Sequence, residues 1–510
     1  MENLFKPVSY RKGAAWAVGS TAVWKACSFI NGVLIALYFG AHTQTDIYFY
    51  LIMICGMGIN FLQHINTAVF IPEAISAEKS SPQAGMRLLN AVFLFYLALG
   101  AGIILAGVAW PQHIAGAISR FSRAQLSQNL PMISAVCALF AFQLWASLLC
   151  NILEMEKRFG SAWLAPANAL LPLVLLISGG RQWGIICMVY GFLAANILQC
   201  LVFLYVLKAQ CAWQFTPGIE GFHARLKKNL FTSQALELIS LINTWIPAYL
   251  ISGLGSGLVS ALNYAKQLAD SPTEILTWRV CAVNKIELSE DSARKDLQAL
   301  NVHFLRTNRL LLFILTPLAV FSFFYAVDII RLFFERGNFT LTAARNAAAF
   351  LQPLLIMMLF FIPITMQNNL FSAERKLKEA FPYLLVSNLI FTGAVIWGIK
   401  QWGAFAYPYV QAVCCLIGFA INKKLFDKHF AHIAYGRALL DMARLVALNL
   451  LALVPAAACT FLCGFKSPFF TLLVGGVMFL AALYAVTQYS GDWKLFITAA
   501  RQSRLASTYK

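Results

Sequence analysis

Long apolar runs separated by short polar breaks make up most of the chain. Many of them approach or exceed 20 residues, the length that an α-helix needs to cross the hydrocarbon core of a bilayer. A membrane β-barrel would instead show segments of about ten residues with alternating apolar and polar positions. The pattern therefore predicts an all-α integral membrane protein with about 14 transmembrane helices, at 14–40, 46–74, 84–110, 131–153, 161–178, 182–208, 230–254, 257–287, 307–329, 343–372, 380–400, 403–423, 440–463 and 468–488.

Two basic, polar breaks divide this series of spans. Residues 1–208 form a predicted first lobe of six spans, and a basic cytoplasmic linker follows at 209–229. A second six-span lobe is predicted at 230–424, and residues 425–510 hold a linker, the last two spans and a cytoplasmic tail. Each lobe opens with a long span, a glycine-containing turn and a second long span with polar positions. This repeat indicates two pseudo-symmetric lobes, as in many transporters.

Charge supports a membrane protein and argues against a nucleic-acid partner. The net charge is +18, but only 12% of residues are charged and 60% are hydrophobic. The basic residues lie mainly in short loops between apolar runs, where topology explains them. If the N-terminus is cytoplasmic, most of the 39 lysines and arginines lie on the cytoplasmic side. This bias predicts a multi-pass protein of the bacterial inner membrane with both termini in the cytoplasm.

The cysteines and the N-terminus add little chemistry. The 12 cysteines are scattered inside apolar runs, so they are interpreted as small buried hydrophobes and not as disulfides or metal ligands. The first apolar run is too long for the core of a cleaved signal peptide and is expected to be a retained span. No Walker loop and no GxSxG motif occurs, and no cofactor or metal is expected.

One lysine lies inside the first span. Lys25 stands about a third of the way along the run 14–40. A lysine near the centre of a membrane helix costs roughly 2.5–3.5 kcal/mol on insertion scales. It is expected to face a polar cavity, and the alternative is a side chain that reaches back to the cytoplasmic interface. Glu237 in the seventh span is a candidate partner.

The eighth span is the richest in ionisable residues. Lys266, Asp270 and Glu274 follow one another at i, i+4 and i+8 on one helix face, with Gln267 beside them and Arg279 further along. One interpretation is a self-neutralising ladder of paired charges. The other is a cavity-facing site for an anionic or ion-coupled substrate.

The second span carries two further candidates. Asp46 stands at its start, where an aspartate is often the N-cap of a helix. His64 lies deep in the same span, as either a packed, hydrogen-bonded residue or a titrating group in a cavity.

Several stretches resemble those of a known family. They are Phe39-Gly40-Ala41 with Thr45-Asp46 and Phe70-Ile71-Pro72, the run Ser260 to Ala265 with Leu268 and Pro272, the run Leu332 to Thr340, and Phe371 to Arg375. Together with the fourteen-span layout, they resemble the MurJ/MviN lipid II flippases of the multidrug/oligosaccharidyl-lipid/polysaccharide exporter superfamily. The resemblance implies a transporter and not an enzyme. It also implies two lobes packed as a V around a cationic cavity, with a final helix pair that forms a groove on the lipid side.

The resemblance assigns roles to some of these residues. Lys25 stands where the family has its first arginine of the first span, and Asp46 matches a family aspartate. Gln267 stands at the arginine of the eighth span, with Lys266 one residue away. In the family, such basic residues are thought to hold the diphosphate of an undecaprenyl-linked sugar.

Other positions depart from the family. Asn31 and Gly32 stand at a second arginine and the aspartate after it, Ile59 stands near an arginine of the second span, and His64 or Gln63 stands near a glutamate. A lysine does not reproduce the bidentate geometry of an arginine on a diphosphate. The cargo is therefore either lipid II itself or a related polyprenyl-linked saccharide.

The sequence thus predicts a monomeric flippase for a polyprenyl-diphosphate-linked saccharide, working by alternating access. Coupling to membrane potential, H⁺ or Na⁺ is a further expectation. The alternatives are an exporter of a cationic or amphipathic small molecule on the same fold and, less favoured, a membrane-embedded enzyme of saccharide-lipid metabolism. The predicted substrate-binding residues are Lys25, Asn31, Asp46, His64, Lys266, Gln267, Asp270, Glu274 and Arg279.

Overall fold

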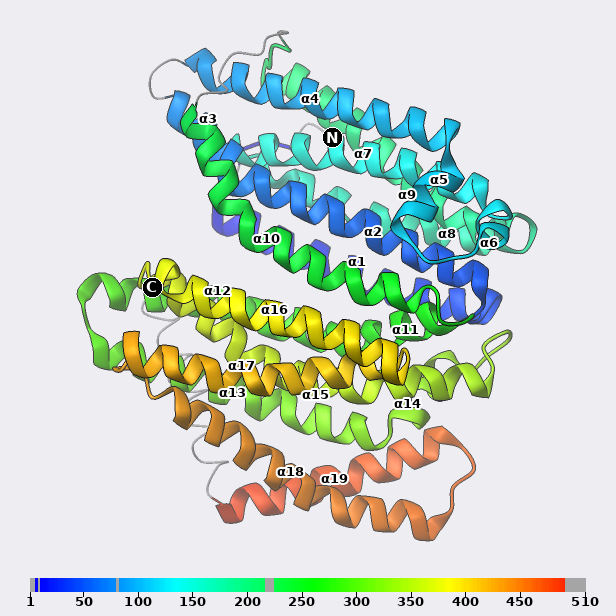
Figure 1. Cartoon of the computed structure of the whole chain (residues 1–510), viewed down its shortest axis with the longest axis vertical. Coiled ribbons are helices and arrows are strands. Elements are labelled where there is room, and N and C mark those ends of the chain that lie inside the picture. The colour runs from blue at the N-terminus through cyan, green and yellow to red at the C-terminus, as the bar shows by residue number, and fades with distance from the viewer. Residues whose placement is uncertain (1–4, 8–9, 79–81, 216–223, 491–510) are drawn as a thin grey trace. The chain divides into compact units, whose positions relative to one another are not determined.

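The computed structural model describes residues 5–7, 10–78, 82–215 and 224–490 (Figure 1). These residues form helices joined by short turns, and no strand occurs among them. Packing divides the chain into two compact units. Unit 1 comprises Met1–Ser260 and Gly337–Phe339, and unit 2 comprises Ala261–Arg336 and Thr340–Lys510. The prediction of an all-α membrane fold is confirmed.

The helices of unit 1 run from α1 to α10. They are α1 (Tyr10–Phe39), α2 (Thr43–Ile65), η1 (Asn66–Phe70), α3 (Ile71–Glu78), α4 (Pro82–Ala109), α5 (Pro111–Ile118), α6 (Arg123–Ser127), α7 (Leu130–Met155), η2 (Phe159–Leu164), α8 (Ala167–Trp183), α9 (Ile186–Gln210) and α10 (Ala224–Ile251). The predicted first lobe ends at residue 208. Unit 1 extends further along the chain and also contains α10.

Helix α7 lies at the centre of unit 1. It packs against α2, α4 and α9, while α8 packs against both α9 and α1. The interior between these helices is aliphatic and aromatic, with Tyr96, Leu148, Leu149 and Phe203 nearly inaccessible. Such close-packed apolar contact holds helices together when their outer faces are in lipid.

The remaining helices belong mainly to unit 2. They are α11 (Leu258–Pro272), η3 (Thr273–Thr277), α12 (Trp278–Arg294), α13 (Leu297–Phe324), α14 (Ala326–Phe334), α15 (Leu341–Ala373), α16 (Leu377–Trp402), α17 (Ala406–His429), α18 (Tyr435–Cys463) and α19 (Pro468–Ser490). Helix α11 begins in unit 1 and continues in unit 2.

Unit 2 repeats the packing pattern of unit 1. Helix α15 packs against α12, α13 and α17, as α7 packs against α2, α4 and α9. Helix α16 packs against α17, as α8 packs against α9. The correspondence holds when the spans are shifted by six, which supports the predicted pseudo-symmetry. The final pair, α18 and α19, pack against each other, and α18 also packs against α13.

Twelve helical segments among the described residues are long and apolar enough to span a membrane. They cover twelve of the predicted spans. The predicted spans 230–254 and 257–287 are occupied by α10 and by the continuous run of α11, η3 and α12. The apolar part of α10 is limited to Glu237–Ile251, and α11 and α12 carry several charges. These two helical runs are therefore less apolar than the other twelve.

The second span of each predicted lobe contains a π-helical segment. In unit 1 it is η1, between α2 and α3, and in unit 2 it is η3, between α11 and α12. Pro272 immediately precedes η3 and has no amide hydrogen to donate to the turn before it, so the regular helix is weakened there. Single π-helical turns inside α-helices are often found at functional sites.

Candidate functional site

Two predicted site residues lie on α1. Lys25 is partly buried, and its ammonium lies 4.8 Å from the centre of the Trp24 ring. Asn31 is buried, and its amide nitrogen donates a 2.9 Å hydrogen bond to the carbonyl of Ala169 on α8. In this structure Asn31 therefore joins α1 to α8. The substrate-binding roles of both residues stay predictions.

The charged residues of the eighth span begin on α11. Lys266 and Gln267 are partly buried there, Asp270 is exposed, and Glu274 lies in η3. Lys266 makes no ion pair with Asp270, although the two are four residues apart, so the described side chains do not form the predicted self-neutralising ladder at this step. An ammonium without a carboxylate partner can attract an anion. Arg279 lies on α12, and its side chain is outside the described residues.

His64 has polar partners on a different helix. Its Nε2 lies 3.6 Å from a carboxylate oxygen of Glu237 on α10. Its Nδ1 lies 3.3 Å from the amide nitrogen of Gln234, one turn earlier on the same helix. The sequence suggested Glu237 as a partner of Lys25, whereas the contact found here is with His64. The ring is hydrogen-bonded and 39% exposed, and its role as a titrating group in a cavity stays a prediction.

Asp46 is not the N-cap of its own helix. Helix α2 begins at Thr43 with His42 as its N-cap, which places Asp46 in the first turn. The carboxylate accepts hydrogen bonds from the amides of Gly257 (2.5 Å) and Ser260 (2.7 Å) and from the Ser260 hydroxyl (2.6 Å). It is buried, with 1% of its surface exposed. Asp46 thus caps the N-terminus of α11, where free amides and the helix dipole favour a negative charge.

The end of α1 is capped in the same way by another distant segment. The side-chain amide of Asn338 donates to the carbonyl of Tyr38 (2.5 Å), and its backbone amide donates to the carbonyl of Leu37 (3.1 Å). These carbonyls belong to the last turn of α1, which has no partners of its own further along the helix. A third contact joins the hydroxyls of Thr43 and Ser256 at 2.9 Å.

Glycines permit these close approaches. Gly257 has a φ of +84°, and a Cβ there would lie 2.7 Å from the carbonyl of Ala41. Gly337 has a φ of +57°, and a Cβ there would overlap the carbonyl of Leu37. Positive φ values are readily adopted only by glycine. We call residues 37–46, 253–260 and 337–339 the helix-end latch. All of them belong to unit 1.

The sequence did not predict the latch, although several latch residues lie in stretches that the sequence marks as notable. Ser260, Gly337 and Asn338 all lie in stretches that carried the family resemblance. Gly257 lies in the glycine-containing turn of the second lobe. Distance along the chain concealed their proximity, because more than 200 residues separate Asp46 from Ser260. The shared feature is a glycine or a small polar residue in or close to a break between two predicted spans.

The family-like stretch Phe371–Arg375 lies elsewhere, at the end of α15. Glu374 there is nearly buried and accepts contacts at 2.7 Å from the imidazole of His432 and from the ammonium of Lys376. The contact between Glu374 and His432 joins the end of α15 to the segment before α18. Among the described residues, no group of three or more His, Cys, Asp or Glu side chains is placed to hold a metal ion.

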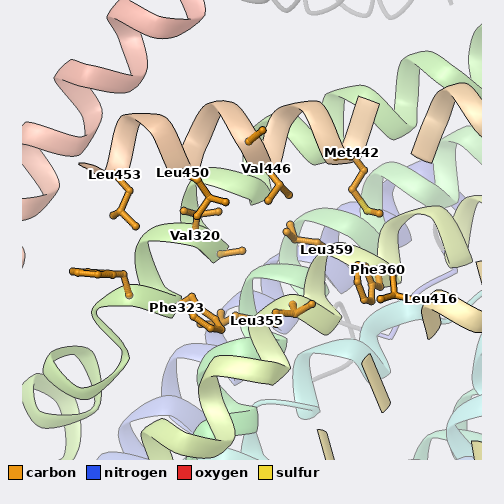
Figure 2. Close-up of a pocket in the computed structure, with 15 residues that line it drawn as sticks. Val320, Phe323, Leu355, Leu359, Phe360, Leu416, Met442, Val446, Leu450 and Leu453 are labelled. Carbon is orange, nitrogen blue, oxygen red and sulfur yellow. The ribbon is translucent and has the colours of Figure 1, made fainter. Parts of the chain in front are cut away.

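An apolar crevice lies in unit 2 between α13, α15, α17 and α18 (Figure 2). Its volume is about 670 Å³, and all of its lining side chains are apolar. The walls are Ala319, Val320, Phe323 and Phe324 of α13; Leu355, Ile356, Leu359 and Phe360 of α15; Leu416 of α17; and Met442, Ala443, Val446, Ala447, Leu450 and Leu453 of α18. Of the last helix pair, α18 contributes to the wall of this crevice and α19 does not.

Comparisons with known proteins agree on one family. The family model described as "Lipid II flippase MurJ" matches residues 35–484. The probable lipid II flippase MurJ of Borreliella burgdorferi is 24% identical over 78% of this chain and 79% of its own length. The lipid II flippase MurJ of Burkholderia cenocepacia is 24% identical over 65% of this chain and 67% of its own length.

Solved structures agree on the fold. A lipid II flippase MurJ in an inward closed conformation matches with a TM-score of 0.76 at 20% identity, over 92% of this chain and 98% of that one. An inward-facing multidrug resistance transporter of the MATE family matches with a TM-score of 0.65 at 12% identity, over 79% of this chain and 94% of that one. At these identities, the structural likeness concerns the fold alone.

Proposed function

Because this chain belongs to the lipid II flippase MurJ family, we propose that it moves lipid II, or a closely related polyprenyl-diphosphate-linked saccharide, across the bacterial inner membrane. The family is one of transporters and not of enzymes. The observation that carries the choice of cargo is the combination, within unit 2, of ionisable side chains on α11 and an apolar crevice. A lipid-linked saccharide has a charged head and a long hydrocarbon tail, so it matches both features.

The head group is assigned to the ionisable spans. Lys266 has no carboxylate partner on α11 and is the first candidate to attract the diphosphate. Lys25 and Arg279 are the other two basic candidates. Asn31 and Gln267, which replace family arginines, are neutral, so the diphosphate would be held by ammonium point charges and less by bidentate guanidinium pairs. Polar side chains of the first, second and eighth spans would accept the sugar.

The tail is assigned to the crevice of unit 2. Its walls between α13 and α18 offer hydrocarbon contacts, and no lining side chain offers a hydrogen bond. A polar cargo would gain nothing from such a surface, whereas a prenyl segment would lose no hydrogen bonds by entering it. The crevice would hold part of the tail while the remainder stays in the bilayer.

The helix-end latch would control one end of the transport cycle. If the N-terminus is cytoplasmic, α1 ends and α2 begins at the periplasmic face. The latch joins this turn to the segments before α11 and α15, which belong to the predicted second lobe. Rocking of residues 1–208 against 230–424 would then require Asp46 and Asn338 to release their partners before cargo leaves outward. Membrane potential could assist, since one charge moved across 100 mV changes the free energy by about 2.3 kcal/mol.

The expected setting is a monomer with both termini in the cytoplasm. A reporter fused after residue 510 should be active in the cytoplasm. A cysteine in place of Lys466, between α18 and α19, should react with a membrane-impermeant maleimide added from the periplasm. Labelling at 466 only after the inner membrane is opened would reverse this topology.

Complementation tests the proposed cargo. The chain is expressed in a strain whose own lipid II flippase is depleted, and growth is followed together with the translocation of lipid II in proteoliposomes. Growth and translocation are both expected. Failure of both, with normal membrane expression, would exclude lipid II. Efflux of a cationic drug that is lost in Asp270→Asn would then favour the exporter alternative.

A double variant tests the cationic head-group site. Lys25→Ala with Lys266→Ala is expected to reduce lipid II translocation at least tenfold, because a charge-assisted contact to a phosphate contributes about 1.5–3 kcal/mol. Lys423→Ala with Lys466→Ala removes two positive charges outside the predicted cavity and serves as the control. Equal translocation by the two double variants would refute the cationic site.

A further inference from the structure

The contact between α2 and α10 contains a pair of side chains that the flippase proposal leaves unused. His64 lies well inside the apolar run Thr43–Glu78, and Glu237 is the first residue of the apolar part of α10. Their ionisable atoms are 3.6 Å apart. Ionisable side chains inside membrane helices are rare and usually serve a pathway or a proton relay.

The partners of the ring determine where its proton lies. The amide nitrogen of Gln234, 3.3 Å from Nδ1, can only donate a hydrogen bond. Nδ1 of a neutral imidazole in this contact is therefore the acceptor, and the ring hydrogen is on Nε2. Nε2 lies 3.6 Å from a carboxylate oxygen of Glu237. In this arrangement the ring is neutral, and a second proton would bind at Nδ1 in place of the hydrogen bond from Gln234.

Addition of that proton would change the contact between the helices. The imidazolium would attract the carboxylate of Glu237, because opposite charges then face each other at about 4 Å or less. It would also force the amide of Gln234 to rotate, so that its oxygen and not its nitrogen meets Nδ1. Both α2 and α10 lead directly into the helix-end latch, since α2 begins at Thr43 and α10 ends just before the turn that holds Gly257.

The surroundings leave Glu237 as the charged partner. The elements of unit 1 packed against α2 and η1 are α3, α7 and α10. Helix α3 carries Glu73 and Glu78, and α7 carries Glu154, while the basic residues of α10, which are Arg225, Lys227 and Lys228, have side chains outside the described residues. Among the described residues, none of these three carboxylates is within ion-pair distance of His64. The side chains of His64 and Glu237 are 39% and 43% exposed, and an exposed ionisable pair is far more stable facing water than lipid.

We propose that His64, with Glu237 and Gln234, binds and releases a proton during the transport cycle. This rests on the proposed flippase function and names H⁺ as its coupling ion. In each turnover, a proton from water would bind to Nδ1 and leave to water again, with no other group oxidised, reduced or transferred. An imidazole suits this role because it exchanges a proton at physiological pH.

The first test is the pH profile of lipid II translocation by the full-length protein in proteoliposomes. Between pH 5.5 and 7.5 the rate is expected to change about fivefold, because an imidazole titrates in this window. His64→Gln is expected to translocate at a rate that no longer varies with pH. Glu237→Gln is expected to alter the pH dependence of the rate, since it removes the carboxylate that lies 3.6 Å from the ring. His113→Gln, at an exposed histidine of α5, should keep the original profile.

A flat profile for the unaltered protein, or an unchanged profile in His64→Gln, would overturn the inference. A second measurement does not need transport. Infrared difference spectra of protein with ¹³C-labelled histidine, recorded between pH 7.5 and 5.5, report on all 7 histidines, and the imidazole-to-imidazolium change should be smaller in His64→Gln than in the unaltered protein. An equally large change in both proteins would refute the proton site. If the two spectra differ while lipid II is not translocated, the proton site stands and the lipid II proposal fails.

Discussion

Asp46 is the residue on which the helix-end latch depends, because its one carboxylate satisfies Gly257 and Ser260 together. An asparagine of the same size offers one acceptor oxygen and introduces a donor that would face the backbone amide of either Gly257 or Ser260, because the two amides bond to different oxygens of Asp46. The charge that complements the N-terminus of α11 is lost as well. The effect of this substitution should therefore be larger than the loss of one ordinary hydrogen bond.

Asp46→Asn is expected to open the latch more often. Hydrogen bonds to a charged group contribute about 1.5–3 kcal/mol each, so the open population should rise by a factor of roughly ten or more. The measurement is the rate at which a membrane-impermeant maleimide labels Val259→Cys, a latch position that is only 5% exposed in this structure, read by mass spectrometry of the peptide. Asp328→Asn makes the same chemical change on α14, outside the latch, and should leave the rate unaltered. Equal labelling with and without Asp46→Asn would show that this carboxylate does not hold the latch.

At this scale the sequence predicted which residues are unusual but not what they touch. An aspartate at the start of a predicted helix is most simply an N-cap, and the three acceptor contacts of Asp46 come from residues more than 200 positions away. His64 was left between two interpretations for the same reason, since Glu237 and Gln234 become neighbours only when α10 packs against α2. The identity of a polar side chain is local, whereas its partner depends on tertiary packing.

At the scale of elements, the glycines of the latch turns give the clearest prediction. Gly337→Ala places a Cβ on a residue with a φ of +57° and against the carbonyl of Leu37. The left-handed conformation alone costs about 1–2 kcal/mol for a residue other than glycine, and the overlap adds to it. We expect lower thermal stability in detergent and weaker complementation of the depleted strain.

The matched control for this substitution is Gly393→Ala on α16. A Cβ at Gly393 would meet no atom within 4 Å, and alanine is favoured over glycine inside a helix by up to about 1 kcal/mol. The control should therefore be as stable as the unaltered protein or slightly more stable. A loss of stability at 393 equal to that at 337 would indicate that the turn conformation is not the cause.

The apolar crevice allows a second element-scale prediction. Val446 on α18 lines it, and Val446→Phe would fill part of its volume with a ring. Translocation of lipid II is expected to fall several-fold with little change in thermal stability, because the space filled is already open. Val454→Phe, on the lipid-exposed part of the same helix, should keep full activity. Equal activity of the two variants would mean that the lipid tail does not use the crevice.

The helices themselves were largely predictable, because apolar runs of sufficient length in a bilayer leave few other structures for the backbone. Their interruptions were not. The π-helical segments η1 and η3 leave no pattern in hydropathy. The place of α19 was also unforeseen, since two consecutive apolar spans do not indicate which of them lines a groove.

At the scale of the whole molecule, the two units repeat the same pattern of helix packing. Contacts of α7 with α2, α4 and α9 recur as contacts of α15 with α12, α13 and α17. The sequence indicated this repeat only through its layout. The latch then has a particular meaning, because it connects the ends of the first two spans with segments that belong to the predicted second lobe. If the transport cycle requires the two lobes to separate there, a covalent bond across the latch should stop it.

Thr43 and Ser256 provide the position for such a bond, since their hydroxyl oxygens are 2.9 Å apart. Two sulfurs at these places need to approach to about 2.05 Å, a small change for side chains in exposed turns. The double variant Thr43→Cys with Ser256→Cys is expected to cross-link under mild oxidation and to lose lipid II translocation, with full recovery after reduction. Each single cysteine variant, treated with the same oxidant, controls for the 12 native cysteines. If the cross-linked protein still translocates lipid II at the original rate, the latch does not have to open, and the exit for the cargo must lie elsewhere.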